Sequence, residues 1–112
     1  MEKQMMDQSI KQTEGKIPLG NLLDFRSALE QVSKVREYGN SKYPDKYSYI
    51  DVPEHLLLDA TIRHLFADCD EEFDIESKQS HIAHAIVNML MILEQRQIKV
   101  GKTNEEENIY RY

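Results

Sequence analysis

Two histidines and an asparagine lie in the most apolar stretch of the chain, where polar side chains could carry chemistry. Residues 80–93 read SHIAHAIVNMLMIL, and after Ser80 the polar side chains are His81, His84 and Asn88. On an α-helix these three lie within roughly 60° of one another. A helix that is apolar all round is normally buried, and an unpartnered buried polar group costs about 1–3 kcal/mol. The stripe therefore predicts a metal site, a ligand site or a structural polar network.

An acidic segment directly precedes this stripe. Asp74 and Glu76 come shortly before the two histidines, and carboxylates beside imidazoles bind Mg²⁺, Mn²⁺ or Zn²⁺. We expect Asp74, His81 and His84 to be metal ligands, and Glu76 and His84 to be catalytic. The alternative for the acidic segment is a solvated surface loop. The HExxH zinc-protease motif is absent.

Further candidates precede the acidic segment. Asp59 and Arg63 are four residues apart on an expected helix, which an ordinary ion pair would explain. Arg63 also suits phosphate, and Asp59 is a candidate catalytic contact for metal or water. His64, adjacent to Arg63, is a candidate substrate contact about 100° around the helix, so we do not expect both to face one point squarely.

A loop expected after the first helix adds two candidate substrate contacts. Lys42 could meet phosphate as a point charge, and Tyr43 could stack on a base. Asn88 is expected to hydrogen-bond the base or to orient a histidine. On the first helix Glu30, Ser33 and Glu37 form a polar stripe, expected to be a solvent face or else to supply a carboxylate to the metal site.

The apolar spacing predicts an all-α fold, a small helical bundle without strands. Gly39, Pro53 and Ser80 mark element ends, and Asp51 and Ser80 are expected helix caps. The expected elements are a flexible arm (1–15), a helical domain (16–98) and a polar tail (99–112). Within the domain we expect helices over 21–38, split near Phe25, then from Pro53 to 68 and from Ser80 to 97, with an ordered loop over 40–52.

Composition narrows the class of partner. The chain has 112 residues and a net charge of −6, which argues against a nucleic-acid polymer but not against a single nucleotide. The single cysteine, Cys69, gives no reason to expect an oxidising compartment. The apolar runs are shorter than the roughly 20 residues of a membrane span, so we expect a cytoplasmic protein with no membrane partner.

The third helix also predicts self-association. Its apolar side chains circle the helix, and two other helices in one chain cover only part of that perimeter. We therefore expect the bundle to be completed by oligomerisation, as a homodimer or homotetramer.

An ordered set of short motifs resembles a known family. The motifs run from Gly15 to about Glu94, and as a set they are quite specific although each alone is not. They read GKIPL (15–19), ALEQVSKV (28–35), YGNSKY (38–43), ATIRHL (60–65), DIES (74–77) and HIAHAIVN (81–88). This pattern resembles the phage-associated family described as the dATP/dGTP diphosphohydrolase N-terminal domain, which is similar to the all-α MazG-like nucleotide pyrophosphohydrolases.

The resemblance implies a metal-dependent enzyme that cleaves a purine dNTP to dNMP and pyrophosphate, with Mg²⁺ or Mn²⁺ as cofactor and Zn²⁺ as a further candidate. If the protein is encoded by a phage, we expect it to act in the cytoplasm of the host. One alternative is a non-catalytic phage protein that sequesters a host nucleotide, including a cyclic signalling nucleotide. Another is a small structural or adaptor protein whose histidines satisfy one another.

Overall fold

The computed structural model describes residues 15–103, and the predicted arm and tail lie largely outside them. The described part is all-α, as the sequence predicts, and its only β pairing is a single bridge between Phe73 and Ser80. None of its helices is both long and apolar enough to cross a membrane. In chain order the elements are 3₁₀ helix η1 (Leu19–Phe25), α2 (Arg26–Lys42), 3₁₀ helix η2 (Ser48–Asp51), α3 (Glu54–Asp68) and α4 (His81–Thr103).

The predicted split near Phe25 is confirmed, but the predicted end of the first helix at Gly39 is wrong. Helix α2 continues through Gly39 to Lys42, and the N–H of Tyr43 still donates to the Gly39 carbonyl at 3.0 Å. Pro44 decides the end, because the residue before a proline is driven out of helical geometry. Tyr43 is accordingly extended, with φ −116° and ψ 134°. The extra turn carries Lys42 onto the same face as Tyr38.

The connection to α3 also differs from expectation. Four residues of the expected loop form η2, and Asp51 belongs to it rather than capping α3. The N-cap position of α3 is Pro53, whose side chain has no hydrogen bond to give. The connection is held from α4 instead, because the buried Gln95 donates to the carbonyls of Tyr49 (2.7 Å) and Val52 (2.6 Å).

The predicted start of the third helix is confirmed, and its end lies further along the chain. Ser80 caps α4 by accepting a hydrogen bond from the Ala83 N–H at 3.1 Å. The helix runs past Gln97 to Thr103, across the expected boundary with the polar tail. A loop over residues 69–80 joins α3 to α4 and is closed by the bridge between Phe73 and Ser80.

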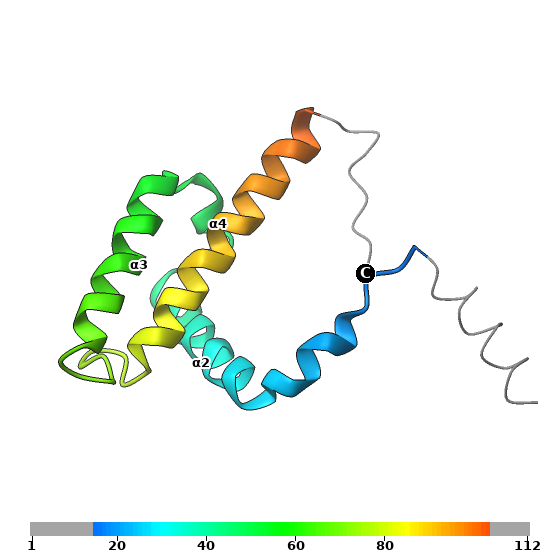
Figure 1. Cartoon of the computed structure of the whole chain (residues 1–112). Helices are drawn as coiled ribbons and strands as arrows, with labels where there is room; N and C mark the ends of the chain where they lie inside the picture. The colour runs from blue at the N-terminus through cyan, green and yellow to red at the C-terminus, as the bar shows by residue number, and fades with distance from the viewer. Residues whose placement is uncertain (1–14, 104–112) are drawn as a thin grey trace, which may run out of the picture.

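Helices α3 and α4 lie side by side, and α2 crosses the first half of α4 (Figure 1). The core at this crossing consists of Val32, Val35, Ala83 and Val87. On α3 the buried positions are Leu57 and Thr61. Several apolar side chains that the periodicity assigns to the core are instead exposed in the single chain: Leu29, Leu56, Leu65 and Phe66. The space left between α2, α3 and α4 positions the site.

Candidate functional site

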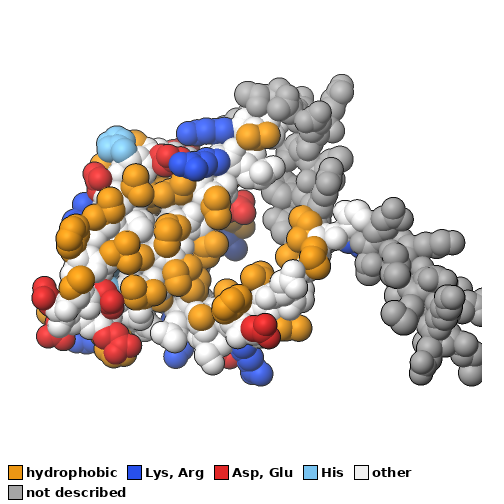
Figure 2. All heavy atoms as spheres, viewed as in Figure 1, with side chains coloured by type: hydrophobic (Ala, Val, Ile, Leu, Met, Phe, Trp, Pro, Cys, Tyr) orange, Lys and Arg blue, Asp and Glu red, His pale blue; other side chains and the backbone are white. Residues whose placement is uncertain are grey.

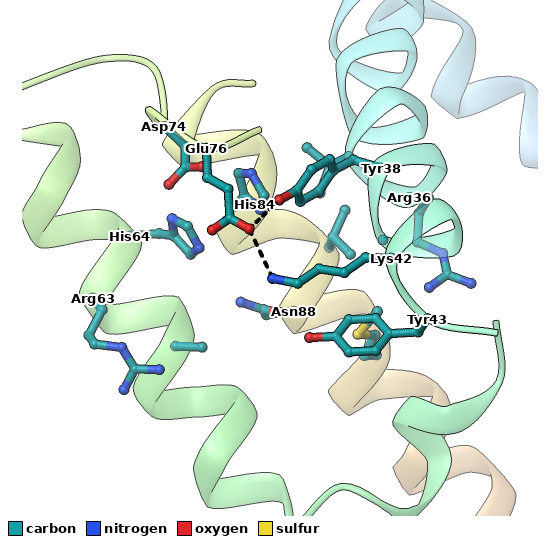
Figure 3. A pocket seen from close by; sticks show the side chains of 15 residues that line it. Arg36, Tyr38, Lys42, Tyr43, Arg63, His64, Asp74, Glu76, His84 and Asn88 are labelled. Carbon is teal, nitrogen blue, oxygen red and sulfur yellow. Dashed lines mark hydrogen bonds and ion pairs between the residues drawn. The ribbon is translucent and has the colours of Figure 1, made fainter. Parts of the chain in front are cut away.

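A cavity of about 410 Å³ lies between α2, α3, α4 and the loop that precedes α4 (Figure 3). This is within the range of small-molecule sites. Its lining combines cationic, acidic, imidazole and aromatic groups over an apolar floor. The lining residues are Val35, Arg36, Tyr38, Gly39, Lys42, Tyr43, Ala60, Arg63, His64, Asp74, Glu76, His84, Val87, Asn88 and Met91.

Most residues that the sequence singles out meet in this cavity. It is lined by all five candidate substrate contacts (Lys42, Tyr43, Arg63, His64 and Asn88) and by Asp74, Glu76 and His84. His81 is buried directly behind it, 7% exposed. Asp59 is exposed on α3 and is not among the residues that line the cavity. Asp59 forms no ion pair with Arg63 among residues 15–103.

Arg63 and His64 both line the cavity. The cavity extends along α3, so neighbouring residues line different parts of it. Figure 3 shows His64 directed toward the loop and Arg63 extending lower along the helix. Arg63 is exposed, and no hydrogen bond or ion pair within the described part of the chain holds its guanidinium.

Two imidazoles and a carboxylate form a tight cluster beside the cavity. The Nδ1 atoms of His64 and His81 are 2.9 Å apart, so one donates to the other in the apo protein. One oxygen of Asp74 and one ring nitrogen of each histidine lie within 4.8 Å of one another. His64 comes from α3, His81 from the start of α4 and Asp74 from the loop between them. The fold thus brings together, from separate segments, three groups of the types that bind metal ions in proteins.

The loop before α4 holds the cluster's carboxylate in place. Asp74 accepts a hydrogen bond from the Ser77 N–H at 2.8 Å, and its own carbonyl accepts one from the Lys78 N–H at 2.8 Å. Lys78 sits at φ 65°, a left-handed conformation that non-glycine residues adopt infrequently. Burial alone would raise the pKa of Asp74, but the hydrogen bonds from Ser77 together with the fields of His84 and His81 outweigh it and leave that pKa below its ordinary value. Asp74 is therefore a carboxylate at neutral pH.

His84 is fixed between the same loop and the imidazole cluster. Its Nε2 lies 2.6 Å from the Ser77 hydroxyl, and its ring stacks on His64 with centroids 4.4 Å apart and planes within 7°. Burial, and then the neighbouring imidazoles, lower the pKa of His64. Burial likewise lowers the pKa of His84 and outweighs the opposing field of Asp74. Both rings are neutral at pH 7 and free to accept a proton or a metal.

Glu76 organises the opposite wall of the cavity. Its Oε1 accepts hydrogen bonds from the Tyr38 hydroxyl at 2.7 Å and from the Lys42 ammonium at 3.1 Å (Figure 3). The bond from Tyr38 and then that from Lys42 lower the pKa of Glu76, and the same contact raises the pKa of Lys42. The result is an ionised carboxylate that holds a protonated lysine at the edge of the cavity.

Tyr38 and Ser77 are site residues that reasoning from residue types missed. Both stand inside the quoted motifs, Tyr38 in YGNSKY and Ser77 in DIES. The four-residue spacing of Tyr38 and Lys42 on one helix face was the available signal. Arg36 also lines the cavity, and nothing in its spacing singles it out. Its guanidinium donates to the Lys46 carbonyl at 3.2 Å and lies over the Tyr49 ring at 5.6 Å.

The polar stripe on α2 is a solvent face. Glu30 and Glu37 are exposed, and Glu30 pairs with Arg26 at 3.2 Å. Neither carboxylate lines the cavity, so α2 supplies no carboxylate to the imidazole cluster.

A second cavity of about 360 Å³ adjoins the first. The two share Arg36, Gly39, Tyr43, Asn88 and Met91, and the second continues toward η2. Its other lining residues are Asn40, Asp45, Lys46, Ser48, Tyr49, Val52 and Leu57. The histidines line only the first cavity, whereas the second combines aromatic, aliphatic and amide side chains with the charged Arg36, Asp45 and Lys46.

The set of metal-ligating atoms has a definite chemical preference. A magnesium ion favours an all-oxygen shell, whereas imidazole nitrogens favour Mn²⁺, Zn²⁺ and similar transition metals. Two nitrogens bound to one tetrahedral zinc ion at about 2.0–2.1 Å stand about 3.3 Å apart, so the observed 2.9 Å separation has to open by a few tenths of an ångström. His64, His81 and Asp74 therefore suit a divalent transition metal better than Mg²⁺.

No curated protein and no solved structure shows significant similarity to the chain. A family model does match, and its match spans residues 6–105. This range includes every residue of the cavity and of the imidazole cluster. The chain belongs to the family described as "dATP/dGTP diphosphohydrolase, N-terminal".

Proposed function

We propose that this protein is a metal-dependent nucleoside triphosphate pyrophosphohydrolase that cleaves a purine dNTP to dNMP and pyrophosphate. The observation that carries the proposal is the His64–His81–Asp74 cluster at the edge of a cavity with cationic side chains. The family description names dATP and dGTP as substrates. An acidic protein with a locally cationic cavity suits a single charged nucleotide rather than a polymer.

In this proposal His64, His81 and Asp74 hold a divalent ion. Mn²⁺ or Zn²⁺ suits their donor set best, and His64 takes the ligand position that sequence reasoning gave to His84. Such an ion neutralises phosphate charge and lowers the pKa of a water molecule. Binding through both Nδ1 atoms requires the donor imidazole to carry its proton on Nε2 instead, a change of tautomer that leaves the ring neutral.

Lys42 and Arg63 are proposed to bind the triphosphate from opposite walls. Arg63 offers an unpaired planar fork, which matches phosphate oxygens in a bidentate manner. Lys42 is held by Glu76, so its ammonium is already oriented when substrate arrives. Glu76 thereby acts as a positioning residue.

His84 is proposed to take up the proton of the attacking water through Ser77. The Ser77 hydroxyl lies 2.6 Å from Nε2 of His84, so it can pass a proton to this neutral imidazole while accepting one from water. Water oxygen then bonds to the α-phosphorus as the bond to the pyrophosphate oxygen breaks. Asp59 has no role in this scheme.

The second cavity is proposed to hold the base and sugar. It continues from the first past Tyr43 and Asn88, which stand at the junction of the two. Tyr43 can stack on a purine, and the Asn88 amide can both donate to and accept from a base edge. Phosphates would then face the metal cluster while the base faces η2.

Product analysis with the four dNTPs tests the proposal. The protein is incubated with each dNTP and Mn²⁺, Zn²⁺ or Mg²⁺, and nucleotides and pyrophosphate are separated and quantified. We expect dNMP and pyrophosphate in equal amounts from a purine dNTP, loss of both with Asp74→Asn, and retention with the matched control Asp59→Asn. Absence of pyrophosphate with every dNTP and metal, or release of intact triphosphate, would contradict it.

One observation favours a second candidate function, capture of an intact nucleotide. Of the two carboxylates lining the first cavity, Glu76 is already bound by Tyr38 and Lys42, which leaves Asp74 alone for metal. Such a site could bind a mononucleotide or a cyclic signalling nucleotide without cleaving it. Equilibrium dialysis followed by recovery of unchanged ligand would favour capture, whereas recovery of dNMP would exclude it for that nucleotide.

A further inference from the structure

Helices α3 and α4 present a broad apolar face on the side opposite the cavity (Figure 2). Each of its large side chains is at least 42% exposed in the single chain, and together they form what we call the α3/α4 face. Its members are Leu58, Ile62, Leu65, Phe66, Ile82, Met89, Leu90 and Leu93. Figure 2 shows these helices covered by hydrophobic side chains, with charged groups at the margins.

The face is separate from the nucleotide cavity. On α4, Ile82, Met89 and Leu93 lie within about 40° of one another and roughly opposite the cavity-lining His84 and Met91. On α3, too, the apolar residues that begin at Leu58 lie on the side of the helix away from the cavity-lining residues around Arg63. One side of the α3–α4 layer therefore lines the cavity, and the other side is exposed to solvent in the single chain.

The exposed area points to a second copy of this chain as the occupant. Eight side chains at these exposures present about 700 Å², more than the largest apolar patch of most monomers and close to the roughly 800 Å² per partner of a stable dimer. The apolar positions of α4 also recur every three or four residues, the spacing at which helices interlock. We propose that two copies pack through their α3/α4 faces about a twofold axis.

Charges at the two ends of the face set the direction of packing. Asp70, Glu71 and Glu72 lie where α3 ends, whereas Arg96 and Lys99 lie toward the far end of α4 with Glu54 as their nearby counter-charge. In an antiparallel arrangement the acidic end of each copy meets the basic end of the other, while a parallel arrangement would bring like charges together. The twofold dimer is therefore antiparallel, with both nucleotide cavities facing outward.

Light scattering after gel filtration tests the interface. At micromolar concentration we expect twice the chain mass of 13.2 kDa. Leu93→Glu and Met89→Lys should each raise the dimer dissociation constant at least about 30-fold, because they bury an unpaired charge. Leu23→Glu is the matched control, since Leu23 is 79% exposed on η1, and it should leave the dimer intact. Circular dichroism checks that each variant is helical.

Disulfide trapping tests the direction. In a Cys69→Ser background, Glu71→Cys and Lys99→Cys are prepared separately and then mixed. Cross-links that form only in the mixture are the antiparallel result, and cross-links within each separate variant would overturn the arrangement. A wild-type monomer, or dissociation by Leu23→Glu with no effect of Leu93→Glu and Met89→Lys, would overturn the interface.

Discussion

Replacing Gln95 with leucine tests how η2 is held against α4. Gln95 is 3% exposed, and its Nε2 donates to the carbonyls of Tyr49 at 2.7 Å and Val52 at 2.6 Å. Leucine removes both bonds while keeping a similar volume. It also removes Oε1, a buried acceptor without a hydrogen-bond partner.

The magnitude follows from these contacts. Two carbonyls lose a buried donor, at about 1 kcal/mol net each, and part of that loss is offset because the unpartnered Oε1 disappears and leucine is apolar. We expect the free energy of unfolding to fall by about 1 kcal/mol, which corresponds to roughly 4–8 °C in Tm for a domain of this size. Tyr49 and Val52 also line the second cavity, so nucleotide binding should weaken as well.

Urea unfolding at a fixed protein concentration measures the effect, since a dimer would make stability concentration-dependent. Gln31→Leu, on the exposed side of α2, is the matched control and should change stability by less than about 0.5 kcal/mol. Equal or greater stability of Gln95→Leu relative to the wild type would refute the reasoning, because the two bonds would then contribute nothing.

The imidazole cluster and the phosphate contacts give further predictions. His64→Ala should abolish the rise in Tm produced by Mn²⁺ or Zn²⁺, whereas His55→Ala, exposed on the same helix, should preserve it; equal responses would exclude His64 as a ligand. Because the pKa values of His64 and His84 lie below the ordinary 6.5, the unfolded chain takes up protons first as pH falls below about 6.5. Stability should therefore decline from pH 7 toward pH 5 until the folded-state pKa values are passed, and replacing both histidines with glutamine should flatten that decline in urea titrations. Arg63→Met and Lys42→Met should each raise the KM for dNTP about tenfold through a lost charge-assisted contact, and an unchanged KM would place the phosphates elsewhere.

Helical periodicity predicted which residues of α4 share a stripe, but not what each of them faces. His81 is directed at His64 on α3, and His84 is directed at Ser77 in the loop. The helix-wheel angle between them is small, so the assignment of ligands depends on how α3 and the loop are placed. Sequence reasoning therefore named His81 and Asp74 as metal ligands and did not place His64 among them.

The end of the first helix shows how two local signals compete. Glycine after an apolar pattern favours helix termination, but Gly39 tolerates helical dihedrals. The helix ends at Lys42 instead, because Pro44 prevents Tyr43 from being helical. This difference matters for the site, because the added turn brings Lys42 within 3.1 Å of Glu76.

The apolar pattern correctly identified helices but not which apolar faces a single chain buries. Leu65 and Phe66 fit a core pattern, yet they are 44% and 72% exposed. Helical periodicity identifies an apolar face, but it does not distinguish a face that is buried within one chain from a face that is buried between two chains.

The position of oxygen incorporation tests the central claim most directly. The reaction is run with dATP or dGTP and Mn²⁺ in ¹⁸O-labelled water, and the products are separated and analysed by mass spectrometry. Attack at the α-phosphorus predicts one ¹⁸O in the deoxynucleoside monophosphate and none in pyrophosphate, with no turnover by His64→Ala. Label in the pyrophosphate, release of the free nucleoside with triphosphate, or unchanged nucleotide under all metals would contradict the account.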